Sequence, residues 1–232
     1  MLDTDRIRAI TLDLDDTLWP VWPTIHRARQ VMNDWLAPRA PATAALLADA
    51  QADAAIRAEL VQSHAHISHD LSAQRRESIR IALRRSGDDE SLTDAAFDVF
   101  FAERQRVDLY DDAIAALEFL AMRHPLLALT NGNADLRRIG IDHYFQGSVT
   151  AREFGVAKPD PRIFQEAAGR LGVAPEAVLH VGDDATLDAH GARQAGMQAV
   201  WINRGGAAWP HGGEAPATVE DLTGLCRLLA PR

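Results

Sequence analysis

Two aspartates separated by one residue, Asp13 and Asp15, stand at the end of a short apolar run that begins at Ile10. A run of this length, bounded by polar residues, is typical of a central strand in a parallel sheet. Residues two apart in a strand point to the same side, so we expect both carboxylates to face one site and Asp16 to point away. Close carboxylates repel each other unless a cation or a proton separates them, and Mg²⁺ prefers oxygen ligands. The pair indicates a magnesium site, and the alternative is a strand followed by an acidic turn.

The chain from residue 111 onward has a pattern that can bring further groups to these aspartates. Stretches that predict strands alternate with stretches that predict helices. The predicted strands are 125–129, 148–150, 177–181 and 198–202, and the predicted helices are 111–123, 133–139, 161–171, 186–195 and a last one from 218 or 220 to 229. This alternation predicts an α/β fold, a Rossmann-like parallel sheet covered by helices on both faces.

Three polar residues lie at the ends of predicted strands. Asp13, Thr130 and Asp183 each come at the end of an apolar stretch, and Lys158 lies in a loop that can reach them. Ligands of parallel α/β sheets bind at the carboxyl ends of the strands. Residues that are scattered along the chain are therefore expected to converge in one site.

Four short motifs contain these residues. They are Asp13-x-Asp15-x-Thr17-Leu18, Leu129-Thr130-Asn131-Gly132-Asn133, Lys158-Pro159-Asp160-Pro161 and Gly182-Asp183-Asp184-x-x-x-Asp188. In this order the motifs resemble the four signatures of the haloacid dehalogenase (HAD) superfamily, and the resemblance runs from about residue 6 to about residue 203. It implies a hydrolase built on the Rossmann-like core described above.

The resemblance to HAD phosphatases implies a role for each residue in phosphoryl transfer. Asp13 is the expected nucleophile and forms an aspartyl-phosphate, while Asp15 is the expected acid and base for the leaving group and the water. Thr130 and Asn131, with the backbone that follows them, are expected to hold the phosphoryl oxygens. Lys158 is expected to bind these oxygens and screen their charge.

The same resemblance implies Mg²⁺ as the cofactor. Asp13, Asp183 and the backbone carbonyl of Asp15 are the expected ligands. Asp188 is expected to steady the lysine or a water on the metal, and Asp184 is a second candidate for this work. A strand-ending turn and helix-capping aspartates are the alternative interpretations of these motifs.

Residues 20–107 differ from the rest of the chain because they show helical patterns only. The predicted helices are 24–36, 43–60, 72–85 and a last one from 91 or 93 to 107. We therefore expect an all-helical cap domain at 20–107, inserted into a core domain made of 1–19 and 108–232. A cap can close over the site and exclude water.

A closer resemblance bears on the substrate. Residues 131–134 and 179–184, together with 69–71 and the arginine-rich helix after them, resemble a bacterial branch of the superfamily. This branch dephosphorylates FMN and the phosphoribitylamino-uracil intermediate of riboflavin synthesis. FMN or that intermediate is therefore the expected substrate.

Aromatic and basic residues are candidates for holding such a substrate. The indole of Trp19 or Trp22 can stack on a flat ring, and Arg75, Arg76 or Arg80 can meet anionic groups. The alternatives are that the tryptophans pack the hinge between the two domains and that the arginines form a solvated helix surface.

Other activities use similar residues. A sugar-phosphate or nucleotide phosphatase or a phosphomutase would carry the same motifs. A metal-free dehalogenase lacks the second acidic residue, so Asp15 argues against it, and a non-catalytic binding protein is expected to lose Asp13 or Lys158. The histidines of one segment, His64, His66 and His69, indicate either a metal site or a surface turn.

The composition and net charge of the chain limit the kinds of partner and the cellular compartment that we expect. The chain has 232 residues, a net charge of −9 and a pI near 5.4, which argues against nucleic acid as a partner and leaves a small phosphorylated metabolite. A single cysteine, Cys226, allows no internal disulfide and favours a reducing compartment. The first residues have no apolar segment typical of a signal peptide, and no run has the length of a membrane span. We expect a cytoplasmic enzyme that uses no membrane, while the sequence does not determine its oligomeric state.

Overall fold

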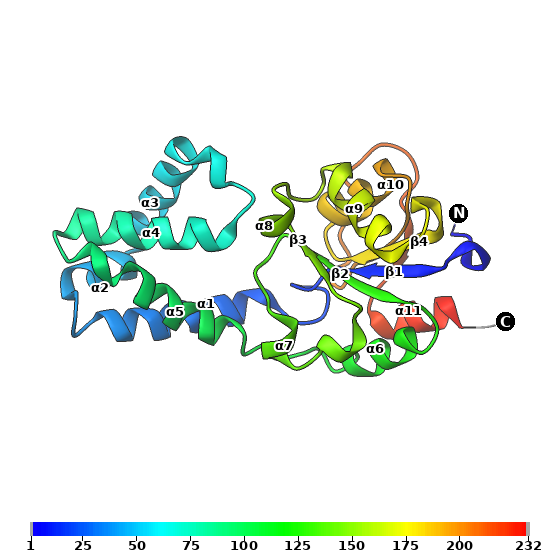
Figure 1. Ribbon diagram of the computed structural model, residues 1–232, viewed down its shortest axis with the longest axis horizontal. Coiled ribbons are helices and arrows are strands. Elements are labelled where there is room, and N and C mark those ends of the chain that lie inside the picture. The colour runs from blue at the N-terminus through cyan, green and yellow to red at the C-terminus, as the bar shows by residue number, and fades with distance from the viewer. Residues whose placement is uncertain (1, 231–232) are drawn as a thin grey trace. The chain divides into compact units, whose positions relative to one another are not determined.

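The computed structural model describes residues 2–230 and consists of two compact units (Figure 1). The first unit runs to Pro20 and resumes at Asp108, and the second unit spans Val21–Val107. The segment before Pro20 and the segment after Asp108 are joined by a backbone hydrogen bond. In this bond the N–H of Tyr110 donates to the carbonyl of Leu18, 2.9 Å away. The second unit is therefore an insertion that begins after the first strand.

The first unit is built on a sheet of six parallel strands in the order β3-β2-β1-β4-β5-β6. The strands are β1 Ala9–Leu12, β2 Leu126–Thr130, β3 Ser148–Thr150, β4 Val178–Gly182, β5 Gln198–Ile202 and β6 Ala217–Val219. Every residue of β1, β2 and β4 is buried, as expected for central strands covered on both faces. The predicted Rossmann-like α/β fold is confirmed.

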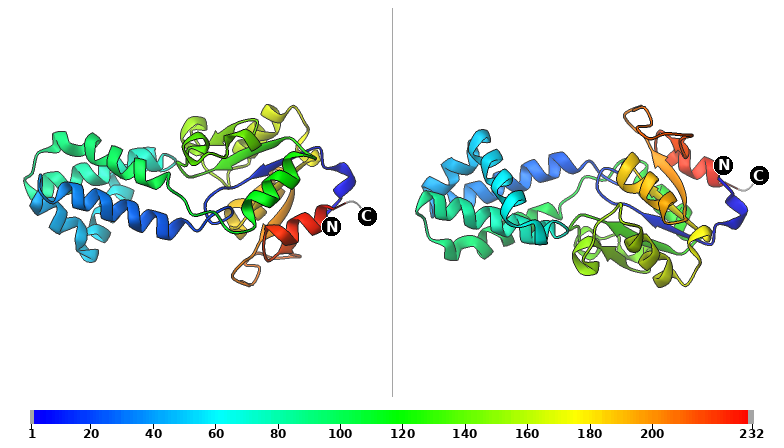
Figure 2. Two further views of the ribbon diagram at one scale, coloured as in Figure 1. Left: turned by 90° about the horizontal axis from the view of Figure 1, so that it is seen from below. Right: turned by 90° about the horizontal axis from the view of Figure 1, so that it is seen from above.

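Helices cover both faces of this sheet (Figures 1 and 2). They are α6 Ala113–Ala121, α7 Leu136–Ile139, α8 Ala151–Phe154, α9 Pro161–Leu171, the π-helical segment η6 Ala185–His190, α10 Gly191–Gln194 and α11 Leu222–Leu229. Helices α6 and α11 lie on one face, and α9 and α10 lie on the other (Figure 1). Helix α9 begins and ends where the sequence predicts, because Pro161 fits a first turn and Gly172, with φ of 69°, closes the last.

Three details of the core unit differ from the prediction. The sixth strand was not predicted, because its three half-buried or exposed residues make no apolar run. The last helix begins at Leu222 and not at 218 or 220, because Asp221 caps it after this strand. The helix predicted at 186–195 is divided into η6 and α10, and the π-helical turn places Asp188 in the buried interior.

The second unit contains only helices among its described residues, in agreement with the predicted pattern. They are α1 Val21–Leu36, α2 Pro41–Ala48, α3 Ala50–Ser63, α4 Leu71–Ser86 and α5 Thr93–Arg104. One apolar cluster joins α1, α4 and α5 through residues such as Met32, Ile79 and Phe100.

Two helix boundaries of this unit correct the prediction. Helix α1 begins at Val21, before Pro23, because a proline in the first turn removes an N–H that has no partner within the helix. The single helix predicted at 43–60 is two helices, since Asp49 accepts bonds from the N–H groups of Gln51 and Ala52 and starts α3.

Short 3₁₀ turns connect several elements, at Thr4–Arg6, Ala65–Ile67, Glu90–Leu92, Asp142–Tyr144 and Pro175–Ala177. Within residues 2–230, every helix is too short or too polar to cross a membrane.

Candidate active site

Three neighbouring strands of the sheet end next to one another and carry the predicted polar residues. β1 lies between β2 and β4, with Leu12 in register with Ala128 on one side and Val181 on the other. Asp13 follows β1 and donates its N–H to the carbonyl of Val181 at 2.9 Å. Thr130 is the last residue of β2, and Asp183 follows β4.

Lys158 reaches into this group from the loop before α9. Its ammonium lies 2.5 Å from Oδ1 of Asp13 and 2.5 Å from Oδ1 of Asp188, and it also donates to the carbonyl of Leu129 at 3.0 Å. The side chain of Lys158 is 2% exposed. All three donors of the ammonium are thus satisfied by groups that come from three separate parts of the chain.

Burial and the two neighbouring carboxylates have opposite effects on the pKa of Lys158. Burial alone lowers the pKa of its amine, but the negative charges of Asp13 and Asp188 outweigh this effect and hold the pKa above its ordinary value. The lysine therefore remains a cation at neutral pH and can screen negative charge.

The side chains of Asp13, Asp183 and Asp188 form a carboxylate cluster in which one oxygen from each lies within 4.8 Å of the others. Burial, followed by the charges of its acidic neighbours, raises the pKa of Asp13 even beside Lys158. Burial and Asp188 likewise raise the pKa of Asp183 to about 7. Several close carboxylates with only oxygen donors are a ligand set that fits a hard divalent cation such as Mg²⁺.

Asp188 is held by contacts to both of its oxygens. Oδ1 meets Lys158 and Nε2 of His180, the latter at 3.1 Å, and Oδ2 accepts from the N–H of Asp184 at 3.0 Å. Burial opposes the charged form, but Lys158 and His180 together outweigh it and lower the pKa of Asp188 below its ordinary value. Gly182 makes room for this carboxylate, since a Cβ atom there would lie 2.3 Å from Cγ of Asp188.

His180 lies within the stretch 179–184, and the sequence predicts no role for it. It is fully buried on β4, between Asp188 and the hydroxyl of Thr11, whose Oγ1 lies 2.8 Å from Nδ1. Burial lowers the pKa of His180, so the ring is neutral at pH 7. The ionised Asp188 can only accept, so Nε2 carries the proton and Thr11 donates to Nδ1. Thr11 and His180 are polar residues inside otherwise apolar strands, and this was the signal in the sequence that could have identified them.

Asp15 and Trp19 correct two expectations. β1 ends at Leu12, and Asp16 has a φ of 60°, so these aspartates lie in a turn and do not follow strand alternation. The indole N–H of Trp19 donates to Oδ1 of Asp15 at 2.8 Å, and the whole side chain is buried. Trp19 therefore positions Asp15, and the prediction that it stacks on a substrate is wrong because no face of the ring is open. Asp15 contributes no carboxylate to the described cluster, so its backbone carbonyl stays the predicted metal ligand.

The side chain of Asn131 has a partner within the protein, while the predicted contact of its backbone with a phosphoryl oxygen stays a prediction. Its side-chain N–H₂ donates to the carbonyl of Lys158 at 2.9 Å, and its Oδ1 accepts from the N–H of Lys158 at 2.7 Å. Both ends of the amide thus hold the backbone of the lysine, so Asn131 positions Lys158 and its side chain is not available for a phosphoryl group. The hydroxyl oxygen of Thr130 accepts from the N–H of Gly132 at 2.9 Å and retains its own proton to donate.

Asp183 and Asp184 have distinct surroundings. Thr17 donates its hydroxyl to Oδ1 of Asp183 at 3.1 Å, and the indole of Trp201 donates to the Asp183 carbonyl at 2.7 Å. Asp184 accepts from the N–H groups that open η6, so its carboxylate caps that segment, which is the alternative interpretation of this motif.

The remaining candidates lie in the helical unit. Trp22 on α1 is 64% exposed, with its ring 6.0 Å from that of His26, and its substrate contact stays a prediction. His64 lies 3.6 Å from Glu77, and within residues 2–230 His64, His66 and His69 form no group of three metal ligands. The metal interpretation of this segment is therefore not supported.

The comparisons of this chain with known proteins agree on one family. Residues 7–196 match the model of the haloacid dehalogenase-like hydrolases. The chain is 35% identical over 202 residues to the 5-amino-6-(5-phospho-D-ribitylamino)uracil phosphatase YigB of Escherichia coli, covering 85% of this chain and 84% of that protein. It is 36% identical over 208 residues to the glyceraldehyde 3-phosphate phosphatase of Methanopyrus kandleri, covering 86% and 85%.

A solved structure shows the same arrangement. The 2-haloacid dehalogenase from Pseudomonas syringae pv. Tomato is 38% identical and superimposes with a TM-score of 0.89, covering 96% of this chain and 98% of that one. The family match, the two relatives and the shared fold agree with the geometry around Asp13 and Lys158. The chain therefore belongs to the haloacid dehalogenase-like hydrolases.

Proposed function

We propose that this protein is a Mg²⁺-dependent phosphatase that hydrolyses small phosphate monoesters through an aspartyl-phosphate on Asp13. The observation that carries the proposal is the presence of a second acid, Asp15, close to the nucleophile. Asp15 follows Asp13 by two residues in the sequence and is held by the indole of Trp19, while Asp13 itself forms a buried ion pair with Lys158. A phosphatase of this kind needs a nucleophile and a separate acid, whereas a dehalogenase needs only the nucleophile. The relatives named as phosphatases support this choice.

The residues of the site have complementary parts in this reaction. Lys158 contacts Oδ1 of Asp13, so we take the other carboxylate oxygen as the attacking atom. Its attack forms a bond to phosphorus as the ester P–O bond breaks, and Asp15 gives a proton to the departing oxygen. Water then attacks phosphorus, Asp15 takes up a proton from that water, and the Asp13 carboxylate and inorganic phosphate are released.

The negative charge of the site must be balanced for this attack to occur. We propose that Asp13, Asp183 and the backbone carbonyl of Asp15 hold Mg²⁺, which when bound neutralises charge on the phosphoryl oxygens. The positive charge of Lys158 screens the same oxygens, and the hydroxyl of Thr130 contributes a donor to them. Asp188 and Asn131 keep Lys158 in place, through its ammonium and its backbone respectively.

The proposed substrate is FMN or the phosphoribitylamino-uracil intermediate of riboflavin synthesis. The name of the Escherichia coli relative and the resemblance of residues 179–184 support it. Because Trp19 is buried, Trp22 is the remaining candidate for stacking on a flat ring. In this proposal the helical unit Val21–Val107 acts as a cap, and the enzyme works in the cytoplasm, where its free Cys226 would remain reduced.

A second candidate function is 2-haloacid dehalogenation. The solved structure with that name, 38% identical to this chain, is the observation that favours it. The same Asp13 would then displace a halide from carbon and form an ester, which water would hydrolyse.

One assay separates the two functions. The purified chain is incubated with p-nitrophenyl phosphate, with FMN and with 2-chloropropionate, in the presence of Mg²⁺ or of EDTA, and phosphate and chloride are measured. We expect release of phosphate with Mg²⁺ only, and no release by Asp13→Asn. Release of chloride without release of phosphate would overturn the phosphatase proposal in favour of the dehalogenase.

A further inference from the structure

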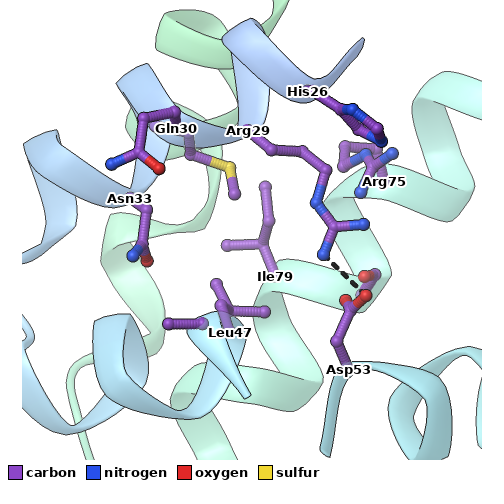
Figure 3. Close-up of a pocket in the computed structure, with 11 residues that line it drawn as sticks. His26, Arg29, Gln30, Asn33, Leu47, Asp53, Arg75 and Ile79 are labelled. Carbon is purple, nitrogen blue, oxygen red and sulfur yellow. Dashed lines mark ion pairs between the residues drawn. The ribbon is translucent and has the colours of Figure 1, made fainter. Parts of the chain in front are cut away.

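The helical unit contains a cavity of its own, apart from the carboxylate cluster. The cavity has a volume of about 290 Å³ and is lined by residues of α1, of α4 and of the α2–α3 region (Figure 3). This volume is at the lower end of the range of about 300–1,000 Å³ that is usual for sites of small ligands.

Arginines outnumber carboxylates around this cavity. Asp53 is buried and lies 2.6 Å from a guanidinium nitrogen of Arg29, and it also pairs with Arg57 from its own helix. Its single charge is therefore already shared between two cations. Arg75 on the facing helix α4 adds a third guanidinium group, so the cavity is positive in a chain whose net charge is −9.

Arg75 has no carboxylate partner within ion-pair distance anywhere in residues 2–230. Its guanidinium carbon lies 4.6 Å from the centre of the Phe100 ring, and its side chain lines the cavity (Figure 3). Burial, followed by repulsion from Arg29, lowers the pKa of Arg75 to about 10, so it is still a cation at neutral pH. Asp53 favours the charged form of Arg75 from a distance, but that carboxylate is already paired with Arg29 and Arg57. A half-buried cation that has no ion pair of its own is costly, and an anion in the cavity would offset that cost.

The opposite wall offers a different contact. Gln30 and Asn33 of α1 lie across the cavity from Arg75 (Figure 3). The Oδ1 atom of Asn33 is buried and lacks a hydrogen-bond partner among the described residues, which is unfavourable for a polar atom. Met32, Leu47 and Ile79 supply an apolar surface between the two polar walls. A ligand that fits both walls has an anionic group for the arginines and a hydroxyl donor for Asn33.

We propose that this cavity is a binding site for a small anionic metabolite that carries one phosphate or carboxylate group and a neighbouring hydroxyl. Arg75 and Arg29 bind the anionic group by charge-assisted hydrogen bonds, and Asn33 accepts from the hydroxyl. This site is formed entirely within Val21–Val107 and does not depend on the reaction at Asp13.

The test is calorimetric titration of the full chain in EDTA with two probes, lactate and glycerol 3-phosphate. At least one probe should bind saturably with one site per chain, and propionate, which lacks the hydroxyl of lactate, should bind more weakly than lactate. Replacing Arg75 by Met should weaken binding by about tenfold or more, since a hydrogen bond to a charged group is lost. The control is Arg84→Met on the same helix, whose guanidinium pairs with Glu90 on an exposed surface and should leave binding unchanged.

Crystals soaked in selenate provide a second measurement that does not require a variant to fold. Anomalous signal between Arg29 and Arg75 is expected, whereas signal confined to other positions overturns the proposal. Absence of saturable binding of both probes, or equal binding by Arg75→Met, also overturns it. None of these measurements involves turnover, so failure of the phosphatase proposal and failure of this one are distinguishable.

Discussion

His180 Nε2 lies 3.1 Å from Oδ1 of Asp188, the same oxygen that the ammonium of Lys158 contacts. His180, a residue of β4, thus positions Asp188, and Asp188 in turn positions Lys158. His180→Leu removes this donor and leaves the hydroxyl of Thr11 without its acceptor, so we expect kcat to fall by about 10–100-fold with little change in KM.

A purely structural role of His180 would give a different pattern. His180→Gln keeps an N–H₂ group near the position of Nε2, and we expect it to recover a substantial part of kcat. The thermal stability of both variants is measured alongside. If the glutamine variant recovers stability but not kcat, His180 does not act through Asp188.

Gly182 lies under the carboxylate of Asp188, where a Cβ atom would come within 2.3 Å of Cγ. Gly182→Ala must therefore displace Asp188, and we expect a loss of activity of at least about tenfold, because Lys158 loses one of its two carboxylate partners. The matched control is Gly169→Ala in α9, where a Cβ atom meets nothing within 4 Å. The control should keep full activity and gain about 0.5–1 kcal/mol of stability from the better helix former.

Removal of metal should abolish activity and change stability in a pH-dependent way. Asp183 has its pKa raised from 3.8 to about 7 by burial and Asp188, so in the folded state it binds a proton more tightly than in the unfolded state. The contribution of this proton is complete below about pH 4 and is lost as the pH rises toward 7. In EDTA, the stability of Asp183→Asn relative to wild type should therefore increase over this range.

Thermal unfolding at several pH values checks this, and addition of Mg²⁺ should raise the melting temperature of wild type more than that of the variant. A constant difference between the two chains from pH 4 to pH 7, together with full activity in EDTA, would contradict the assignment of Asp183 to the metal.

Trp19 and Trp22 should respond differently to substitution. Trp19→Phe removes the N–H that holds Asp15, so we expect kcat to fall for every substrate, and most for esters with poor leaving groups, which depend on protonation. Trp22→Ala removes an exposed ring and should lower kcat/KM for FMN selectively. Both variants are compared on FMN and on acetyl phosphate, and an equal loss for Trp22→Ala on the two substrates would contradict stacking.

The core topology and the identity of the main polar groups were predictable from the sequence alone. Parallel strands all end at one edge of their sheet, so Asp13, Thr130 and Asp183 had to lie near one another once the strands were recognised. The helical character of residues 21–107 was equally accessible, because helical periodicity is a local property.

The tertiary structure alone decided which partner each side chain takes. Asn131 binds the backbone of Lys158, Trp19 binds Asp15, and His180 binds Asp188, although the sequence indicated a substrate for the first two and nothing for the third. The turn at Asp16 and the π-helical turn that contains Asp188 help to set these directions, and neither follows from a pattern of apolar residues. Spacing along a strand or helix determines which face a residue occupies, whereas its hydrogen-bond partner depends on how distant segments pack together.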